Sequence, residues 1–114
     1  MGAEMGSDAQ VALAAAVDRM WVQYLPLTEE RVQALEIAAQ AFAEDHLSIE
    51  EHEAAQAAAH KLAGILGTFG LTRGTVLARE LEIMYSRQNG PDPEMAGKLK
   101  EIAGELRVIV ASRR

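Results

Sequence analysis

Apolar residues recur at steps of three and four along almost the whole of this 114-residue chain, which is the spacing of one face of an α-helix. Alanine is abundant, aromatic residues make up 4% of the sequence, and there are three prolines. These features predict an all-α protein. Because the length is typical of one core, we expect a single helical domain over residues 8–114. Residues 1–7 are expected to be a disordered head or a remnant of cloning.

Capping residues and prolines divide the chain into five expected helices. Short connections make neighbouring helices antiparallel, so the last four predict an antiparallel up-and-down four-helix bundle, with the first as an additional N-terminal helix beside or across it. Their expected limits are Ser7 or Asp8 to Pro26, Thr28 to about Asp45, about Ile49 to Gly70, Thr72 to the stop Asn89-Gly90-Pro91, and Asp92-Pro93 to Val110. The third follows a capping box of Ser48 and Glu51.

Each expected helix has an apolar stripe that predicts its buried face. In chain order the stripes are Leu13, Val17, Met20, Trp21 and Tyr24; Val32, Leu35, Ala39 and Phe42; Ala55, Ala58, Leu62, Ile65, Leu66 and Phe69; Val76, Leu77, Leu81, Met84 and Tyr85; and Met95, Leu99, Ile102, Leu106, Ile109 and Val110. Trp21 and Tyr24 are expected to dock the first helix rather than to bind a ligand.

Charge and composition exclude several classes of function. The net charge is −6, with 17 acidic and 11 dispersed basic residues, so no basic face for nucleic acid is expected. No apolar run approaches the roughly 20 residues that cross a bilayer, and the N-terminus does not resemble a signal peptide. The absence of cysteine excludes disulfides, thiolate zinc sites and cysteine nucleophiles, and fits a cytoplasmic protein.

The stretch AAAHKLAGILGTFG, residues 57–70, places His60 among alanines and glycines. Residues three, four and seven positions away share its face of the helix, and the large apolar residues lie mainly on the opposite side. His60 is therefore predicted to point outward or along the boundary of the core. The positions on its face are Glu53, Gln56, Ala57, Ala63, Gly64 and Gly67.

Small side chains around an exposed imidazole allow another protein to approach the helix backbone closely. A neutral imidazole has one nitrogen with a free lone pair, and this nitrogen is a nucleophile. The arrangement suits a histidine that receives and passes on a phosphoryl group. Gln56, one turn earlier, is a candidate to hydrogen-bond the ring or its phosphate and to fix the tautomer. The alternative is an ordinary surface histidine beside glycines that permit tight helix packing.

The segment AHKLAGILGTFGL, followed by ARELE at residues 78–82, resembles the histidine-containing phosphotransfer (Hpt) domains of two-component phosphorelays. The family pattern is a histidine, a leucine two residues on, a glycine four residues on, a further glycine, and a leucine-glutamate pair in the following helix. The matching positions here are His60, Leu62, Gly64, Gly67 or Gly70, and Leu81-Glu82. The resemblance covers roughly residues 28–109.

The resemblance implies a phosphorelay intermediate with no catalytic site of its own. Its partners are expected to be the receiver domain of a response regulator, a hybrid histidine kinase, or both. The partner receiver supplies the magnesium ion, so no cofactor or metal site is expected on this chain. The implied phosphoacceptor is His60, and the implied docking residues are Gln56, Ala57, Lys61, Ala63, Gly64 and Gly67.

The sequence departs from the family at one position that bears on charge. Many members carry a lysine three residues after the histidine, where this chain has Ala63, and Lys61 lies about 100° away around the helix. Arg73 and Arg79 are weaker candidates for meeting an acidic partner. A structural bundle, or a degenerate Hpt domain that docks receivers without transfer, therefore stays open as the alternative.

The other two histidines, His46 and His52, are expected to be ordinary solvated residues. His52 lies eight residues before His60, which does not give the spacing of a metal-binding pair on a helix. No independent hydrolytic site is predicted, because no acid, base or oxyanion donor converges on His60 in the sequence.

Overall fold

The computed structural model describes residues 2–87 and 90–113 and consists of helices joined by short loops. No strand occurs in these ranges, which confirms the all-α fold class. The elements are α1 (Gly2–Ala43), α2 (Ile49–Thr68), α3 (Thr72–Ser86), the 3₁₀ helix η1 (Pro93–Met95) and α4 (Ala96–Ser112). A search of the described residues for a helix long and apolar enough to cross a membrane found none.

The first two expected helices are one continuous helix, so the expectation that Pro26 ends a helix is wrong. Proline in a helix interior removes one backbone hydrogen bond and costs about 3 kcal/mol. Burial of apolar side chains on both sides of Pro26 offsets this cost, because Trp21 before it and Val32 after it lie in the core. Thr28 is not a cap but is fully buried, and its hydroxyl donates to the Tyr24 carbonyl 2.8 Å away.

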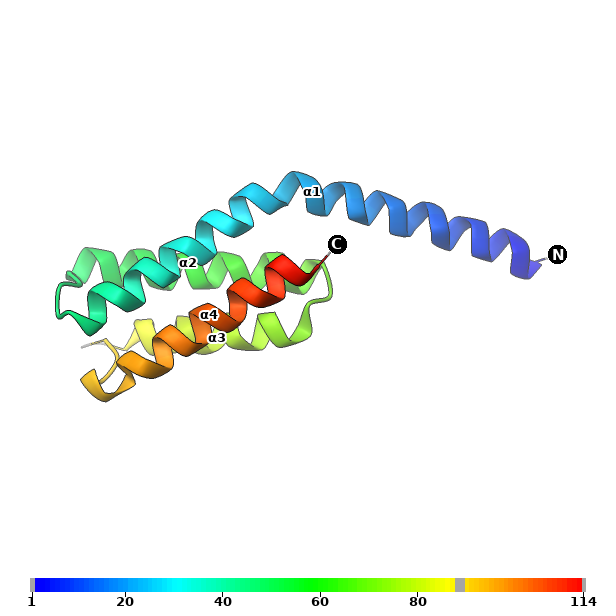
Figure 1. Ribbon diagram of the computed structural model, residues 1–114. Coiled ribbons are helices and arrows are strands. Elements are labelled where there is room, and N and C mark those ends of the chain that lie inside the picture. The colour runs from blue at the N-terminus through cyan, green and yellow to red at the C-terminus, as the bar shows by residue number, and fades with distance from the viewer. Residues whose placement is uncertain (1, 88–89, 114) are drawn as a thin grey trace.

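The α1 ribbon bends part-way along its length, in the light-blue region of Figure 1. A proline in the interior of a helix is a recognised cause of a bend, and so is a threonine whose hydroxyl hydrogen-bonds to a carbonyl of the preceding turn. The part of α1 before the bend runs beyond the other helices, and the molecule measures 62 × 20 × 20 Å. The expected additional N-terminal helix is thus the first part of α1, and the expected disordered head falls within α1 from Gly2 onward.

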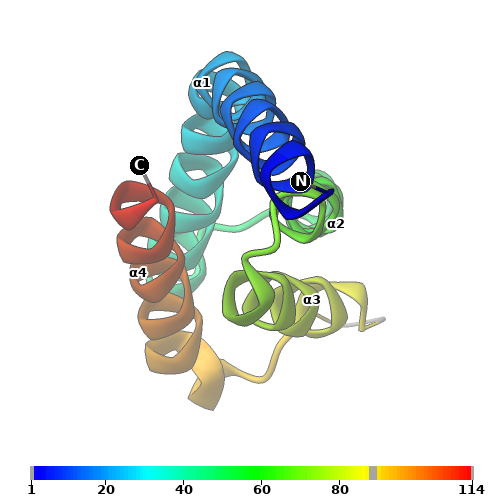
Figure 2. The same cartoon turned by 90° about the vertical axis from the view of Figure 1, so that its right-hand side faces the viewer.

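The second part of α1 and helices α2, α3 and α4 form a four-helix bundle. In the end-on view of Figure 2, α1 lies between α4 and α2, and α3 lies on the opposite side. Each helix packs against its neighbours in this ring, α1 on α2 and α4, and α3 on α2 and α4. This arrangement agrees with the bundle expected for the last four helices, with the second part of α1 in the place of the second of the five expected helices.

The apolar stripes predict most of the core correctly. The largest buried side chains are Trp21, Val32, Leu35, Leu62, Leu66, Leu81, Leu99 and Leu106. Some expected core residues are instead exposed, because they lie at the edge of a stripe or before the bundle begins: Leu13, Met20, Tyr24, Val76 and Met95.

The capping box before α2 is confirmed. Glu51 donates its backbone N–H to the Ser48 hydroxyl at 3.1 Å, and Ser48 donates its own backbone N–H to the Glu51 carboxylate at 3.0 Å. This hydrogen bond lowers the pKa of Glu51, since it favours the ionised carboxylate. The cap at Thr72 is wrong, because Leu71 is the N-cap of α3 and no side chain caps this end.

The α3–α4 connection agrees with the predicted stop in part. Helix α3 ends at Ser86, Gly90 has φ +71°, and Asn89 lies outside the described residues. Asp92 and Pro93 begin η1 as expected, and α4 follows at Ala96.

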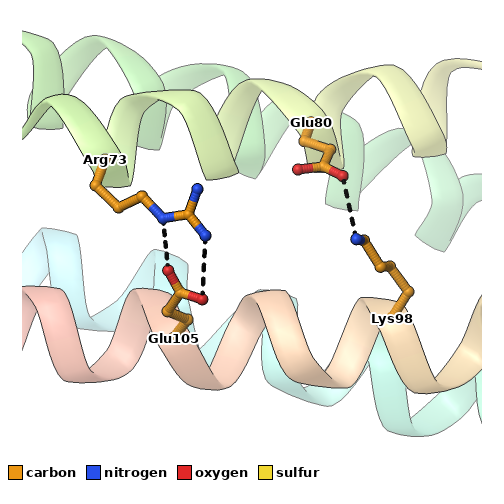
Figure 3. A network of polar contacts seen from close by, with 4 residues as sticks. All are labelled: Arg73, Glu80, Lys98 and Glu105. Carbon is orange, nitrogen blue, oxygen red and sulfur yellow. Dashed lines mark hydrogen bonds and ion pairs between the residues drawn. The ribbon is translucent and has the colours of Figure 1, made fainter.

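Surface ion pairs join α3 to α4, as Figure 3 shows. Arg73 donates to Glu105 at 2.8 Å, and Lys98 lies 3.8 Å from Glu80. Exposed pairs of this kind contribute only about 0–1 kcal/mol each. They favour the register of the two helices, while the buried leucines supply most of the stability.

Contacts of Trp21, Phe69 and Arg113 pack α1 against the rest of the bundle. Trp21 and Phe69 pack edge to face with ring centroids 5.2 Å apart. The Arg113 guanidinium lies 5.0 Å from the Trp21 centroid and 5.5 Å from that of Phe69, and it pairs with Asp18 at 3.4 Å. Aromatic and cation–π contacts each contribute on the order of 1 kcal/mol.

Gly74 and Gly104 provide a matched test of the packing of α3. A Cβ at Gly74 meets Leu66 Cδ1 at 2.8 Å and Ile109 Cγ2 at 3.3 Å, whereas a Cβ at Gly104 meets nothing within 4 Å. We expect Gly74→Ala to lower the free energy of unfolding by about 1–3 kcal/mol through overpacking. Gly104→Ala should raise it by about 0.5–1 kcal/mol through helix propensity. Urea denaturation measures both, and equal effects in the two variants would contradict the close packing at Gly74.

Candidate functional site

His60 projects into solvent from the middle of α2. Its side chain is 71% exposed, whereas Ala59 and Leu62 of the same helix are fully buried. Burial of these neighbours fixes the rotation of α2 about its axis and leaves the imidazole outside the bundle. The prediction that His60 points away from the core is confirmed.

Within the described ranges, the imidazole has one hydrogen-bond partner, which comes from the neighbouring helix α3. His60 Nδ1 lies 2.8 Å from a Glu82 carboxylate oxygen, and the Glu82 side chain is 25% exposed. An ionised carboxylate only accepts hydrogen bonds, so Nδ1 carries the proton and donates it to Glu82. In the neutral ring, Nε2 then holds the free lone pair. The partner of Nδ1 is thus Glu82 rather than Gln56.

On the exposed side of His60, the surrounding side chains are small and the surface lies close to the helix backbone. Ala57, Gly64 and Gly67 are exposed, and a Cβ at Gly64 meets nothing within 4 Å. Lys61 is exposed as well, and Gln56 is half-buried. These five expected docking residues therefore reach the surface of α2.

Ala63 does not belong to this surface. It is 3% exposed and lies in the hydrophobic core, so its expected role as a docking residue is wrong. Residues three positions after a helical residue are displaced by about 60° to one side, and here that side faces the bundle. If position 63 carried a charged side chain, as in many family members, that side chain would begin in the core and not on the docking face.

A hollow of about 520 Å³ opens beside His60 where α1 and α2 meet. Its lining is mostly apolar, and His60, Lys61 and Arg31 bring polar groups to it. The remaining lining residues are Met20, Tyr24, Leu27, Gly64, Ile65, Thr68 and Phe69. The α1 contribution was missed from the sequence, because it depends on how α1 packs against α2.

Comparison with known proteins identifies the family. The family model described as Hpt domain matches residues 19–110. The chain belongs to the Hpt domain family. It is also 30% identical over 100 residues to Protein RcaC of Microchaete diplosiphon. That match covers 88% of this chain and 15% of the relative, so the chain spans only a small part of that protein's length. A search of solved structures gave no match.

Family membership implies a phosphotransfer role in two-component systems. Hpt domains are phosphocarrier modules rather than catalytic enzymes, and they interact with receiver domains in phosphorelays. The resemblance inferred from residues 57–70 and 78–82 is therefore confirmed at the level of the family.

The structure distinguishes between the candidate cations of this Hpt domain. Arg73 is held by Glu105 through two hydrogen bonds on the α3–α4 side, which also raise the pKa of its guanidinium. Arg79 is exposed on α3. Of the lysines and arginines in the described ranges, only Lys61 and Arg31 line the same hollow as His60.

The remaining histidines differ from each other. His46 is exposed, as expected, but His52 is half-buried. The His52 ring packs edge to face against Phe42 and Tyr85, with centroids 6.1 and 5.9 Å away. Burial also raises the pKa of Tyr85 to about 12. Neither histidine shares the hollow beside His60.

The contact with Glu82 predicts the tautomer of His60. At pH 8 free imidazole is neutral, so ring ¹⁵N shifts report which nitrogen holds the proton. We expect the wild-type ring to be protonated at Nδ1, and Glu82→Ala to give a mixture of the two tautomers. Glu80→Ala, which removes a carboxylate of the same helix that pairs with Lys98, is the matched control and should leave the His60 shifts unchanged. A predominantly Nε2-protonated wild-type ring would refute the assignment.

Proposed function

We propose that His60 is the phosphoacceptor of this Hpt domain and that it exchanges a phosphoryl group with the aspartate of a receiver domain. The observation that carries this proposal is the His60–Glu82 contact: a 71% exposed ring has Nδ1 2.8 Å from a carboxylate. The nitrogen with the free lone pair is then the one that remains open to a partner.

The transfer is a direct displacement at phosphorus. The Nε2 lone pair attacks the phosphorus of the aspartyl phosphate, the bond from phosphorus to the aspartate oxygen breaks, and the carboxylate leaves with that electron pair. The ring becomes positively charged and keeps its proton on Nδ1, where Glu82 stabilises the charge. Transfer to a second receiver reverses these steps. Such reactions depend mostly on alignment and charge stabilisation.

The rest of the active centre is expected to come from the partner. The receiver supplies the magnesium ion and the acidic pocket, and this chain supplies a rigid, accessible imidazole. The low surface formed by Ala57, Gly64 and Gly67 supports close approach of such a pocket to α2.

Labelling tests the role of His60. After incubation with magnesium ions and a receiver domain charged by acetyl phosphate, the wild type should carry acid-labile, base-stable phosphate, and His60→Gln should carry none. His46→Gln is the control, because it removes an exposed histidine outside the site and should leave labelling unchanged. Circular dichroism checks that the His60→Gln variant retains its helices. Equal label on that variant would disprove the assignment, and receiver binding without label on the wild type would indicate a degenerate domain.

Gly64 tests the need for a low surface. A Cβ there meets nothing within 4 Å, so Gly64→Leu should keep or slightly raise stability, by up to about 1 kcal/mol. It should nevertheless slow transfer from a charged receiver at least tenfold, because the side chain stands one turn from His60. Gly104→Leu on α4 is the matched control, because a Cβ there also meets nothing within 4 Å, and transfer is expected at the wild-type rate. Unchanged transfer in Gly64→Leu would show that the partner docks elsewhere.

A further inference from the structure

The burial of Ala63 raises the question of which group balances the phosphoryl charge. A phosphoryl group on His60 brings about two negative charges to a surface where the Glu82 carboxyl group already lies 2.8 Å from the ring. With Ala63 in the core, α2 offers only Lys61 beside the ring. A second cation, Arg31, reaches the same hollow from α1.

Antiparallel packing explains why Arg31 lies at the level of His60. Tyr24 of α1 packs edge to face on Phe69 of α2, with ring centroids 5.9 Å apart. Arg31 follows Tyr24 by seven residues, and Leu62 precedes Phe69 by seven. Both steps are about two helical turns, or roughly 10 Å, in the same direction along the bundle. Arg31 therefore faces the turn of α2 that carries His60 and Lys61.

Arg31 is placed for a ligand rather than for an internal ion pair. The residues three and four positions away on its helix are the uncharged Leu27, Thr28, Ala34 and Leu35. Its Nε is buried and has no hydrogen-bond partner among the described residues. By contrast, Arg73, Arg87, Arg107 and Arg113 each pair with a carboxylate. A half-buried guanidinium without such a pair favours an anion that arrives from outside.

We propose that Arg31 contacts the phosphoryl group during its transfer to and from His60 and stabilises its charge. The proposal rests on the proposed function of His60. The guanidinium is planar and its paired N–H groups match two phosphate oxygens, a geometry that a lysine does not reproduce. The apolar wall formed by Leu27 and Ile65 reduces screening by water and so strengthens this attraction. In this chain, α1 supplies the charge that many Hpt domains place on the helix of the histidine.

Phosphoramidate is a suitable probe, because it phosphorylates imidazole directly and needs no partner protein. The imidazole nitrogen attacks phosphorus, the phosphorus–nitrogen bond of the donor breaks, and ammonia leaves. We expect Arg31→Met to lower the maximal rate of His60 phosphorylation about tenfold or more, with the half-saturating donor concentration changed less than threefold. Arg31→Lys should recover part of the rate, since it restores the charge without the planar fork.

Arg79→Met is the matched control, because it removes the same charge from an exposed site outside the hollow. It should retain the wild-type maximal rate, and thermal denaturation verifies that all variants are folded. The wild type, Arg31→Met and Arg31→Lys are then compared with a receiver domain charged by acetyl phosphate, where the same order of rates is expected.

The outcomes separate this proposal from the proposed function. If wild-type His60 takes phosphate and Arg31→Met is as fast as Arg79→Met, the Arg31 proposal is wrong and the carrier role stands. A change confined to the half-saturating concentration would also overturn it, because it would indicate a binding role alone. If wild-type His60 takes no phosphate from either donor, the proposed function itself fails.

Discussion

The constraint on which the rest of the structure depends is the burial of one stripe of α2 among the other helices. Ala59, Leu62 and Leu66 have no exposed surface, and each contributes a transfer free energy that is lost if the helix turns. A rotation of α2 by one residue, about 100°, would bring apolar groups into water and His60 into the core. The packing that stabilises the fold therefore also holds the imidazole in the orientation that the proposed function needs.

The proposed function needs a correct tautomer, an accessible nitrogen and compensation of the phosphoryl charge, and it assigns these three needs to different helices. Helix α2 presents the ring, and α3 holds Nδ1 through Glu82. Helix α1 borders the hollow and brings Arg31 to it. The ion pairs between α3 and α4 lie outside the site and favour the register of those two helices. The Arg113 contacts with Trp21 and Phe69 also lie outside it and link α1 to the C-terminal end of α2.

The elements that could be predicted from the sequence are those set by local periodicity and capping. The Ser48–Glu51 box, the stripe through Leu62 and Leu66, and the exposure of His60 all follow from residues within two turns of one another. The Glu82 contact spans 22 residues and depends on how α2 and α3 approach, although the leucine-glutamate pair marked its position. The place of Arg31 beside the hollow could not be predicted for a similar reason, because it depends on how α1 packs against α2. Ala63 was misplaced because a position 60° from the exposed face can belong to either side.

Pro26 shows how tertiary packing overrides a local rule, and with what consequence for the site. A helix that stopped there would place the aromatic residues before it and the apolar residues after it on separate elements, free to move relative to each other. Because α1 continues through Pro26, Tyr24 before it and Leu27 and Arg31 after it belong to one helix and form one wall of the hollow. The Phe69 contacts fix that wall against α2 at one end. The cost of one proline in the helix interior is thus offset by contacts that also place Arg31 beside the same hollow as the imidazole.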